Sequence, residues 1–166
     1  MSAPTLHTPR LTLRPMREAD FPPYRDMMAS PRSRYMGGPY GERGAWGLFC
    51  HDVACWSLFG FGALMVDLIA TGETVGQVGI SAGPRFPENE LGWMLYEGFE
   101  GRGYATEAAA ALRNWAFKTM GLETLVSYID PANTPSRRVA ERLGAVFDPD
   151  AVPQDPGDLV FRHHPS

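Results

Sequence analysis

Cysteine is scarce in this chain, with two residues among 166. Two cysteines exclude a disulfide-dense secreted scaffold, because such folds rely on several bridges. Cys50 and Cys55 flank His51, but a structural zinc site needs about four ligands at a familiar spacing. We therefore expect no bound metal, and we expect both cysteines to be reduced and packed on a helix or a strand.

Long apolar runs and an excess of basic residues are also missing. The most apolar stretch runs from Trp56 to Ala70, and Asp67 and two glycines interrupt it. It is too short and too polar for a transmembrane helix, which needs about 20 apolar residues. Residues 1–10 contain no apolar signal core. The net charge of −4 argues against a general nucleic-acid binder, so we expect a soluble, cytoplasmic protein that binds neither membranes nor nucleic acids.

What the chain does contain is typical of a single globular domain, residues 1–166. Its length suits one domain, and a composition of 44% hydrophobic and 20% charged residues permits a buried core. Alternating and near-helical apolar patterns predict the elements of the first half. These are strands at 10–16, 61–70, 74–82 and 90–96, helices at 18–29 and 42–58, and a loop at 31–44 that is rich in proline and glycine.

The second half has a more helical pattern. An alanine-rich apolar stripe ends at Gly121, which suits a helix cap. Thr134 followed by Pro135 predicts the N-cap and first residue of another helix, which Gly144 ends. The expected elements are helices at 104–120 and 134–143, strands at 125–129, 145–147 and 159–163, and an acidic loop at 148–158. This order predicts a mixed α+β domain.

The segment from Glu90 to Glu107 carries the most specific chemistry. A strand leads into a loop with Gly101 and Gly103, and a helix begins directly after it. Free N–H groups at the start of a helix bind anions, and glycine lets a phosphate approach the backbone. Thr106 stands at the third glycine of a dinucleotide fingerprint, and the Gly-Lys-Ser/Thr of an ATP-binding loop is missing. The segment therefore predicts a phosphate or pyrophosphate site, or else a plain glycine-rich turn.

This segment resembles the acetyl-CoA pyrophosphate loop of the GNAT superfamily of N-acetyltransferases. The motif of that family is Gln/Arg-x-x-Gly-x-Gly/Ala, and it falls here on residues 100–105. Gly103 and Ala105 match the motif, whereas Glu100 stands where the family has Gln or Arg. Arg102 lies between these positions and can offset phosphate charge.

Further segments resemble the ribosomal-protein N-terminal (alanine) acetyltransferase-like branch of the superfamily. Residues 8–15, Thr-Pro-Arg-Leu-Thr-Leu-Arg-Pro, are similar to the opening of that branch. Residues 133–145 resemble its Asn-x-x-Ser…Lys-Leu-Gly-Phe motif, with Ala145 in place of the usual aromatic residue. The final segment 158–163 is also similar. Together with the loop, these segments follow the order of the family over nearly the whole chain.

The resemblance implies a fold and a co-substrate. The fold is an α+β (mixed α/β) domain with a central, mostly antiparallel twisted sheet of six to seven strands, flanked by about four helices. Its fourth and fifth strands, here 90–96 and 125–129, splay apart and admit the pantetheine arm of acetyl-CoA. The residues implied to bind acetyl-CoA are Met94, Leu95, Tyr96, Gly101, Arg102, Gly103, Tyr104, Ala105, Thr106, Asn133 and Ser136. Asn133 can instead simply shape the turn before its helix.

The resemblance also implies direct attack of an amine on the thioester. Glu90 is the expected general base, although a solvated glutamate on the rim of a site is the common alternative. Ser136 is the expected acid for the departing thiolate, with Tyr128 behind it. A backbone N–H near Leu95 is expected to stabilise the oxyanion. Ser136 also suits the first turn of a helix, and Tyr128 suits a core position.

The acceptor amine must be neutral to attack. At pH 7.4 this costs about 4 kcal/mol for a lysine and under about 1 kcal/mol for an α-amine, at roughly 1.36 kcal/mol per pKa unit. The aspartates of loop 148–158 either attract a cationic acceptor or are solvated. His163 and His164 are expected in a frayed terminus.

The sequence thus predicts an acetyl-CoA-dependent N-acetyltransferase, a monomer or homodimer, whose acceptor is a protein N-terminus or a small-molecule amine. Two other classes stay open: a non-catalytic acyl-CoA-binding or sensing domain, and a phosphate-binding regulatory module.

Overall fold

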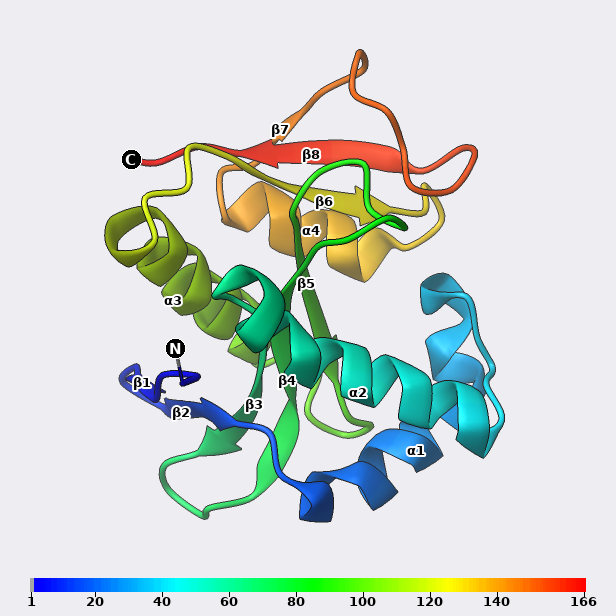
Figure 1. Cartoon of the computed structure of the whole chain (residues 1–166), viewed down its shortest axis with the longest axis vertical. Helices are drawn as coiled ribbons and strands as arrows, with labels where there is room; N and C mark the ends of the chain where they lie inside the picture. Colours follow the sequence, from blue (N-terminus) through cyan, green and yellow to red (C-terminus); the bar gives the residue numbers. More distant parts are fainter. Residues whose placement is uncertain (1) are drawn as a thin grey trace.

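The computed structural model describes residues 2–166, which are built around one eight-stranded sheet (Figure 1). The strands are β1 (Leu6–His7), β2 (Leu11–Pro15), β3 (Ala63–Leu68), β4 (Thr74–Ser81), β5 (Glu90–Leu95), β6 (Leu125–Ile129), β7 (Val146–Phe147) and β8 (Leu159–His163). Their order in the sheet is β1-β2-β3-β4-β5-β6-β8-β7. All neighbours are antiparallel except β5 and β6. The mostly antiparallel sheet is confirmed, and β1 adds one strand that was too short for its pattern to be recognised.

Helices cover both faces of the sheet. They are α1 (Phe21–Ala29), α2 (Glu42–Phe59), α3 (Tyr104–Thr119) and α4 (Thr134–Arg142), with short 3₁₀ helices η1 (Glu18–Asp20) and η2 (Pro31–Met36). The alanine stripe of α3 packs in one core cluster with Val78 and Ile80 of β4. Gln77, which points to the other face of β4, donates to Asp52 of α2 at 3.2 Å. Within residues 2–166, no helix is both long and apolar enough to cross a membrane.

Local capping explains where these helices differ from the prediction. The helix expected over 18–29 begins as η1, and α1 follows with prolines in its first turn. The loop expected over 31–44 contains η2, because the side chain of Ser30 accepts the Arg32 amide and Pro31 begins the helix. The N-cap of α4 is Asn133 rather than Thr134, since its side chain accepts the Ser136 amide.

The parallel pair β5 and β6 separates soon after it begins. The only residue pair joining the two strands in the described chain is Glu90 with Val126. Beyond it, Trp93 of β5 packs against a cluster of Ile129, Ala140 and Phe161 that belongs to β6, α4 and β8. The expected splay of the strands at 90–96 and 125–129 is therefore confirmed, and Trp93 lies in the opening.

The C-terminal strand is fixed rather than frayed, which corrects the expectation for His163. β8 pairs with β6 along its whole length, and the His163 side chain is 1% exposed. The Ser127 hydroxyl donates to Leu91 O at 2.6 Å, so His163 Nε2, at 2.8 Å, is assigned as the donor to Ser127 Oγ. His163 Nδ1 is buried, and no described residue forms a hydrogen bond with it. Burial lowers the pKa of His163 to about 4, because protonation would place an unpaired charge in the core.

We expect the stability of the wild type to decrease, relative to His163→Phe, as the pH falls from about 6.5 towards 4. In this window the unfolded chain binds a proton at His163, whereas the folded chain keeps the ring neutral down to a pKa of about 4. The difference approaches about 1.4 kcal/mol per pH unit and about 3 kcal/mol in total. Urea unfolding at stepped pH measures it. The control is His164→Gln at the exposed neighbouring residue, which should keep the wild-type dependence of unfolding free energy on pH. If the unfolding free energies of the wild type and His163→Phe changed with pH in parallel, the lowered pKa of His163 would be contradicted.

Candidate functional site

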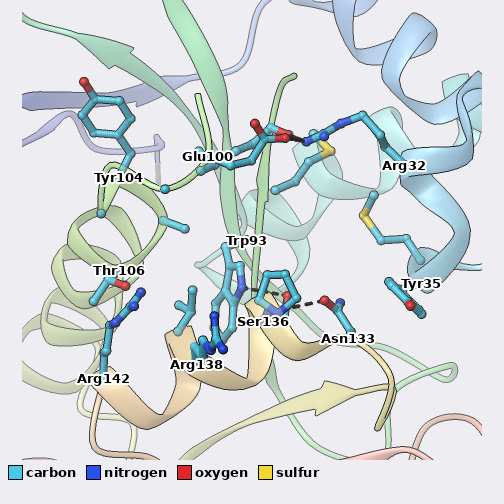
Figure 2. Close-up of a pocket in the computed structure, with 18 of the residues that line it drawn as sticks. Arg32, Tyr35, Trp93, Glu100, Tyr104, Thr106, Asn133, Ser136, Arg138 and Arg142 are labelled. Carbon is cyan, nitrogen blue, oxygen red and sulfur yellow. Dashed lines mark hydrogen bonds and ion pairs between the residues drawn. The ribbon is translucent and has the colours of Figure 1, made fainter. Parts of the chain in front are cut away.

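Two adjoining cavities open at the splay between β5 and β6. The first, of about 540 Å³, lies among the end of β5, the start of α3, η2 and α4 (Figure 2). The second, of about 480 Å³, lies among β4, β5, β6, the first two helices and the loops at 83–89 and 148–158. The residues that line both are Tyr35, Met36, Trp93, Met94, Asn133 and Ser136. A ligand in one cavity therefore meets a ligand in the other at Trp93 and Ser136.

The start of α3 presents free amides to the first cavity. Gly103 is the N-cap of the helix, with a left-handed φ of 83°, and its carbonyl accepts the first helical bond from the Glu107 amide. The N–H groups of residues 104–106 precede that bond and have no helical acceptor. Thr106 Oγ1 is also buried without a partner among the described residues. Both features fit a phosphate group, as predicted for this loop.

The opening segment of the chain holds this loop from outside. Arg10 Nε donates to Glu107 Oε2 at 2.7 Å, and Arg10 Nη1 donates to Arg102 O at 2.9 Å. The Arg10 guanidinium also lies over the Tyr104 ring, 4.7 Å from its centroid. The Arg102 side chain is exposed and does not line the first cavity, whereas Gly101 does. The backbone of the loop, rather than the Arg102 side chain, therefore faces the cavity.

The register of β5 decides which backbone groups face the opening. The Tyr96 amide donates to Val75 O at 2.8 Å, so it is used within the sheet. Successive residues of a strand direct their backbone N–H and C=O groups to opposite neighbouring strands. Met94, two residues before Tyr96, therefore also directs its backbone groups to β4. Leu95 and Trp93 face the splay instead. Of the three strand residues predicted to pair with pantetheine, only Leu95 directs its backbone into the opening.

Glu100, the residue that departs from the family motif, is neutralised by a residue from η2. Its carboxylate accepts the Gly98 amide at 3.0 Å and forms an ion pair with Arg32. Arg32 also donates to Leu95 O at 2.8 Å. Partial burial would raise the pKa of Glu100, but the amides of its loop and the Arg32 cation hold it below its usual range. Position 100 thus carries an ion pair rather than an isolated negative charge.

Asn133 and Ser136 lie where the cavities meet. Asn133 Oδ1 accepts a hydrogen bond from the Ser136 amide at 3.4 Å, so this side chain shapes the turn before α4. Ser136 Oγ accepts from Trp93 Nε1 at 3.3 Å (Figure 2). Since the hydroxyl oxygen accepts this bond, its own hydrogen is free to be donated.

Glu90 is half-buried and lines the second cavity. Desolvation raises its pKa to about 8, and the negative charges of Asp158 and Asp52 add to the effect. Asp52 of α2 lines the same cavity, and its burial raises its pKa to about 7 despite the hydrogen bond from Gln77. Two carboxyl groups that titrate near neutral pH therefore share one cavity.

Tyr128 lines the second cavity, which Ser136 also lines. Its hydroxyl accepts the Glu88 amide at 2.9 Å, and the first cavity does not reach it. Burial raises the pKa of Tyr128, so its hydroxyl stays protonated at neutral pH. Tyr128 thus lies beside Glu90 in the cavity that Ser136 also lines, and its role behind Ser136 stays a prediction.

The acidic loop divides into a structural part and a cavity-facing part. Asp148 accepts from Arg162 Nε at 2.8 Å, and the same arginine holds Glu88 through two bonds. Asp155 and Asp158 line the second cavity. These two aspartates lie where they can attract a cationic acceptor, and that role stays a prediction.

Sequence reasoning missed two charged residues of the site. Asp52 lies between Phe49 and Trp56 on the buried stripe of α2, and a carboxylate on an apolar stripe is a detectable signal. Arg32 carried no such signal, because its segment was expected to be a loop.

The comparisons with known proteins agree on one class. A family model described as the acetyltransferase (GNAT) domain matches residues 10–146. The fold is thus that of a GNAT acetyltransferase domain. The chain belongs to the GNAT family.

Solved structures and curated relatives support this assignment. An acetyltransferase from Agrobacterium tumefaciens str. C58 is 63% identical, with a TM-score of 0.96 over 99% of this chain and 96% of that chain. RimL, a ribosomal L7/L12 α-N-protein acetyltransferase solved with coenzyme A, has the same fold at 16% identity, with a TM-score of 0.75 over 97% of this chain and 98% of that chain. The uncharacterised N-acetyltransferase YnaD from Bacillus subtilis is 38% identical over 55 residues, 33% of this chain and 32% of the relative. The chain thus matches about a third of that curated relative's length.

Thr106→Val should weaken the binding of coenzyme A about 3- to 10-fold without lowering the melting temperature of the free protein. The valine removes a hydroxyl that has no partner among residues 2–166, so only a ligand loses a hydrogen bond. Isothermal titration calorimetry and a thermal melt measure the two effects.

The matched control is Thr124→Val, whose hydroxyl donates to His163 O and accepts from Arg162. This variant should lose about 1 kcal/mol of stability and keep the wild-type affinity. An unchanged affinity of Thr106→Val would exclude this hydroxyl from the binding site.

Proposed function

We propose that this protein transfers the acetyl group of acetyl-CoA to a primary amine in the cytoplasm. The observation that carries the proposal is the junction of two unlike cavities at Trp93 and Ser136. One cavity offers free amides that fit phosphates, and the other is lined by carboxylates. Such a junction brings an anionic acyl donor and a cationic acceptor to one point.

The first cavity fits acetyl-CoA. The amides of residues 104–106 suit the diphosphate, as does the Thr106 hydroxyl, which has no partner among the described residues. The splay-facing edge of β5 at Trp93 suits the pantetheine amides. The related fold of RimL was solved with coenzyme A, which supports the same use of this chain. Acetyl-CoA supplies a thioester whose carbonyl carbon is open to attack by an amine.

The second cavity suits an amine. Five carboxyl groups line it, and Arg85 is the one arginine among its described lining residues. The nearby His51 is held neutral by desolvation, which lowers its pKa. The lining carboxyl groups are Asp52, Glu90, Asp130, Asp155 and Asp158. Those of them that are ionised give the cavity a negative field, which concentrates ammonium groups at the junction. Either a protein N-terminal α-amine or a small-molecule amine meets this requirement.

Glu90 is the group we assign as general base. A pKa of about 8 matches the α-amine, whose ordinary pKa is about 7.7–8.0, so the proton transfers at little cost. The neutral amine attacks the carbonyl carbon, its proton passes to Glu90 directly or through water, and the C–S bond breaks.

Two further groups complete the transfer. The Leu95 N–H faces the opening and suits the developing oxyanion, as expected from the sequence. The Ser136 hydroxyl is free to donate its hydrogen to the departing thiolate, because its oxygen already accepts from Trp93. Tyr128, beside Glu90, suits the acceptor side rather than the thiolate.

The proposal is tested by thiol release from acetyl-CoA across a panel of primary amines that includes peptides with free N-termini. We expect release only with a free amine, together with one added acetyl group on that amine by mass spectrometry. Peptides whose N-terminus is blocked are the control. Tight binding of coenzyme A without thiol release across the panel would instead indicate a non-catalytic acyl-CoA-binding domain.

Glu90→Gln should lower kcat/KM about 10²-fold at pH 8 and abolish the acidic limb of the pH profile. The base is active when deprotonated, so wild-type kcat/KM should fall as the pH decreases through a pKa of about 8. The profile should be measured with an amine acceptor whose pKa lies well below that of Glu90. The titration of the amine then does not overlap with the titration of Glu90.

Asp52→Asn is the matched control, because it removes the other titrating carboxylate of the cavity. It should keep the acidic limb. If the limb disappears in Asp52→Asn and persists in Glu90→Gln, the base is Asp52.

A further inference from the structure

The phosphate loop of this chain has a negative charge where its family has a neutral or positive side chain, and η2 supplies the opposite charge. Arg32 extends from η2 across the mouth of the first cavity to Glu100 (Figure 2). The Arg32 side chain is 34% exposed, and the Glu100 side chain is 45% exposed. The pair therefore lies at the entrance, where a ligand still reaches it.

Arg32 connects the two parts of the site that the donor must contact. Its Nη2 donates to Leu95 O at 2.8 Å, on the strand edge that faces the splay. Its ion pair with Glu100 ties it to the loop, since the Glu100 carboxylate also accepts the Gly98 amide. The guanidinium is thus held between the loop and β5.

Arg32 also retains binding capacity. Its Nε is buried and has no hydrogen-bond partner among the described residues. An unpaired N–H of a cation is costly unless a ligand accepts it, and a guanidinium matches the geometry of phosphate oxygens. Arg34, two residues further along η2, lies 4.6 Å over the Tyr35 ring instead.

We infer that Arg32 binds the diphosphate of acetyl-CoA and that Glu100 is a positioning residue that holds the Arg32 guanidinium at the loop. The inference rests on the proposed function, because it assigns the donor to the first cavity. The positive charge that the family carries within its motif comes here from a separate helix.

Calorimetric titration of Arg32→Gln with coenzyme A, in the absence of any amine, tests the inference. We expect a dissociation constant about tenfold above that of the wild type. Dephospho-CoA keeps the diphosphate and lacks the 3′-phosphate, so it should show the same loss. Arg32→Lys should recover part of the affinity. Arg25→Gln is the control, because Arg25 forms an exposed ion pair with Asp26 on α1 and should keep wild-type binding.

Glu100→Gln in the Arg32→Gln background tests the positioning role. Without Arg32, the Glu100 carboxylate is unpaired beside the diphosphate, so its removal should restore several-fold of the lost affinity. Unchanged binding by Arg32→Gln, with an unchanged melting temperature, would overturn the inference. A loss seen with coenzyme A but not with dephospho-CoA would overturn it as well, since Arg32 would then contact the 3′-phosphate.

A wild type that binds no coenzyme A would refute the proposed function itself. If instead the wild type binds coenzyme A and Arg32→Gln binds it equally well, only the assignment of Arg32 is refuted.

Discussion

The separation of two parallel strands is the constraint on which the rest of the site depends. β5 and β6 share one residue pair, Glu90 with Val126, and then diverge. A strand that loses its neighbour exposes backbone groups that need other partners. In this chain Leu91 O is satisfied by Ser127 and Leu95 O by Arg32. The pantetheine arm of the proposed donor would pair with the backbone groups of this edge that the protein itself leaves free.

β5 forms part of the wall of both cavities. Glu90, Leu91 and Gly92 line the second cavity, Leu95 lines the first, and Trp93 and Met94 line both. Trp93 also contacts Ser136 of α4. The loop after β5 adds the amides of α3, so one continuous segment serves both the proposed donor site and the proposed acceptor site.

Much of the fold was readable from the sequence, because its patterns are local. The strands at 125–129 and 159–163 have the predicted bounds, and the α3 helix differs from its prediction by one residue at its end. The glycine loop predicted an anion site because the amides at a helix start are free whatever the tertiary structure. The family match confirmed the class that the ordered motifs suggested.

What the sequence could not predict depends on contacts between distant segments. The raised pKa values of Glu90 and Asp52 arise from desolvation in a cavity that segments distant in the sequence line together. His163 looked like part of a loose terminus because its burial requires β8 to pair with β6. The partner of Glu100 was hidden for the same reason, because η2 and the loop are far apart in the sequence and meet only in the folded chain.

The short helix η2 has a consequence for how the binding of one substrate affects the binding of the other. Tyr35 and Met36 line both cavities, while Arg32 of the same helix contacts the phosphate loop. A ligand that shifts η2 in one cavity therefore reshapes the wall of the other. Thermodynamic linkage requires that the factor by which donor binding changes acceptor affinity equals the factor by which acceptor binding changes donor affinity. The short helix η2 thus gives both half-sites part of their wall.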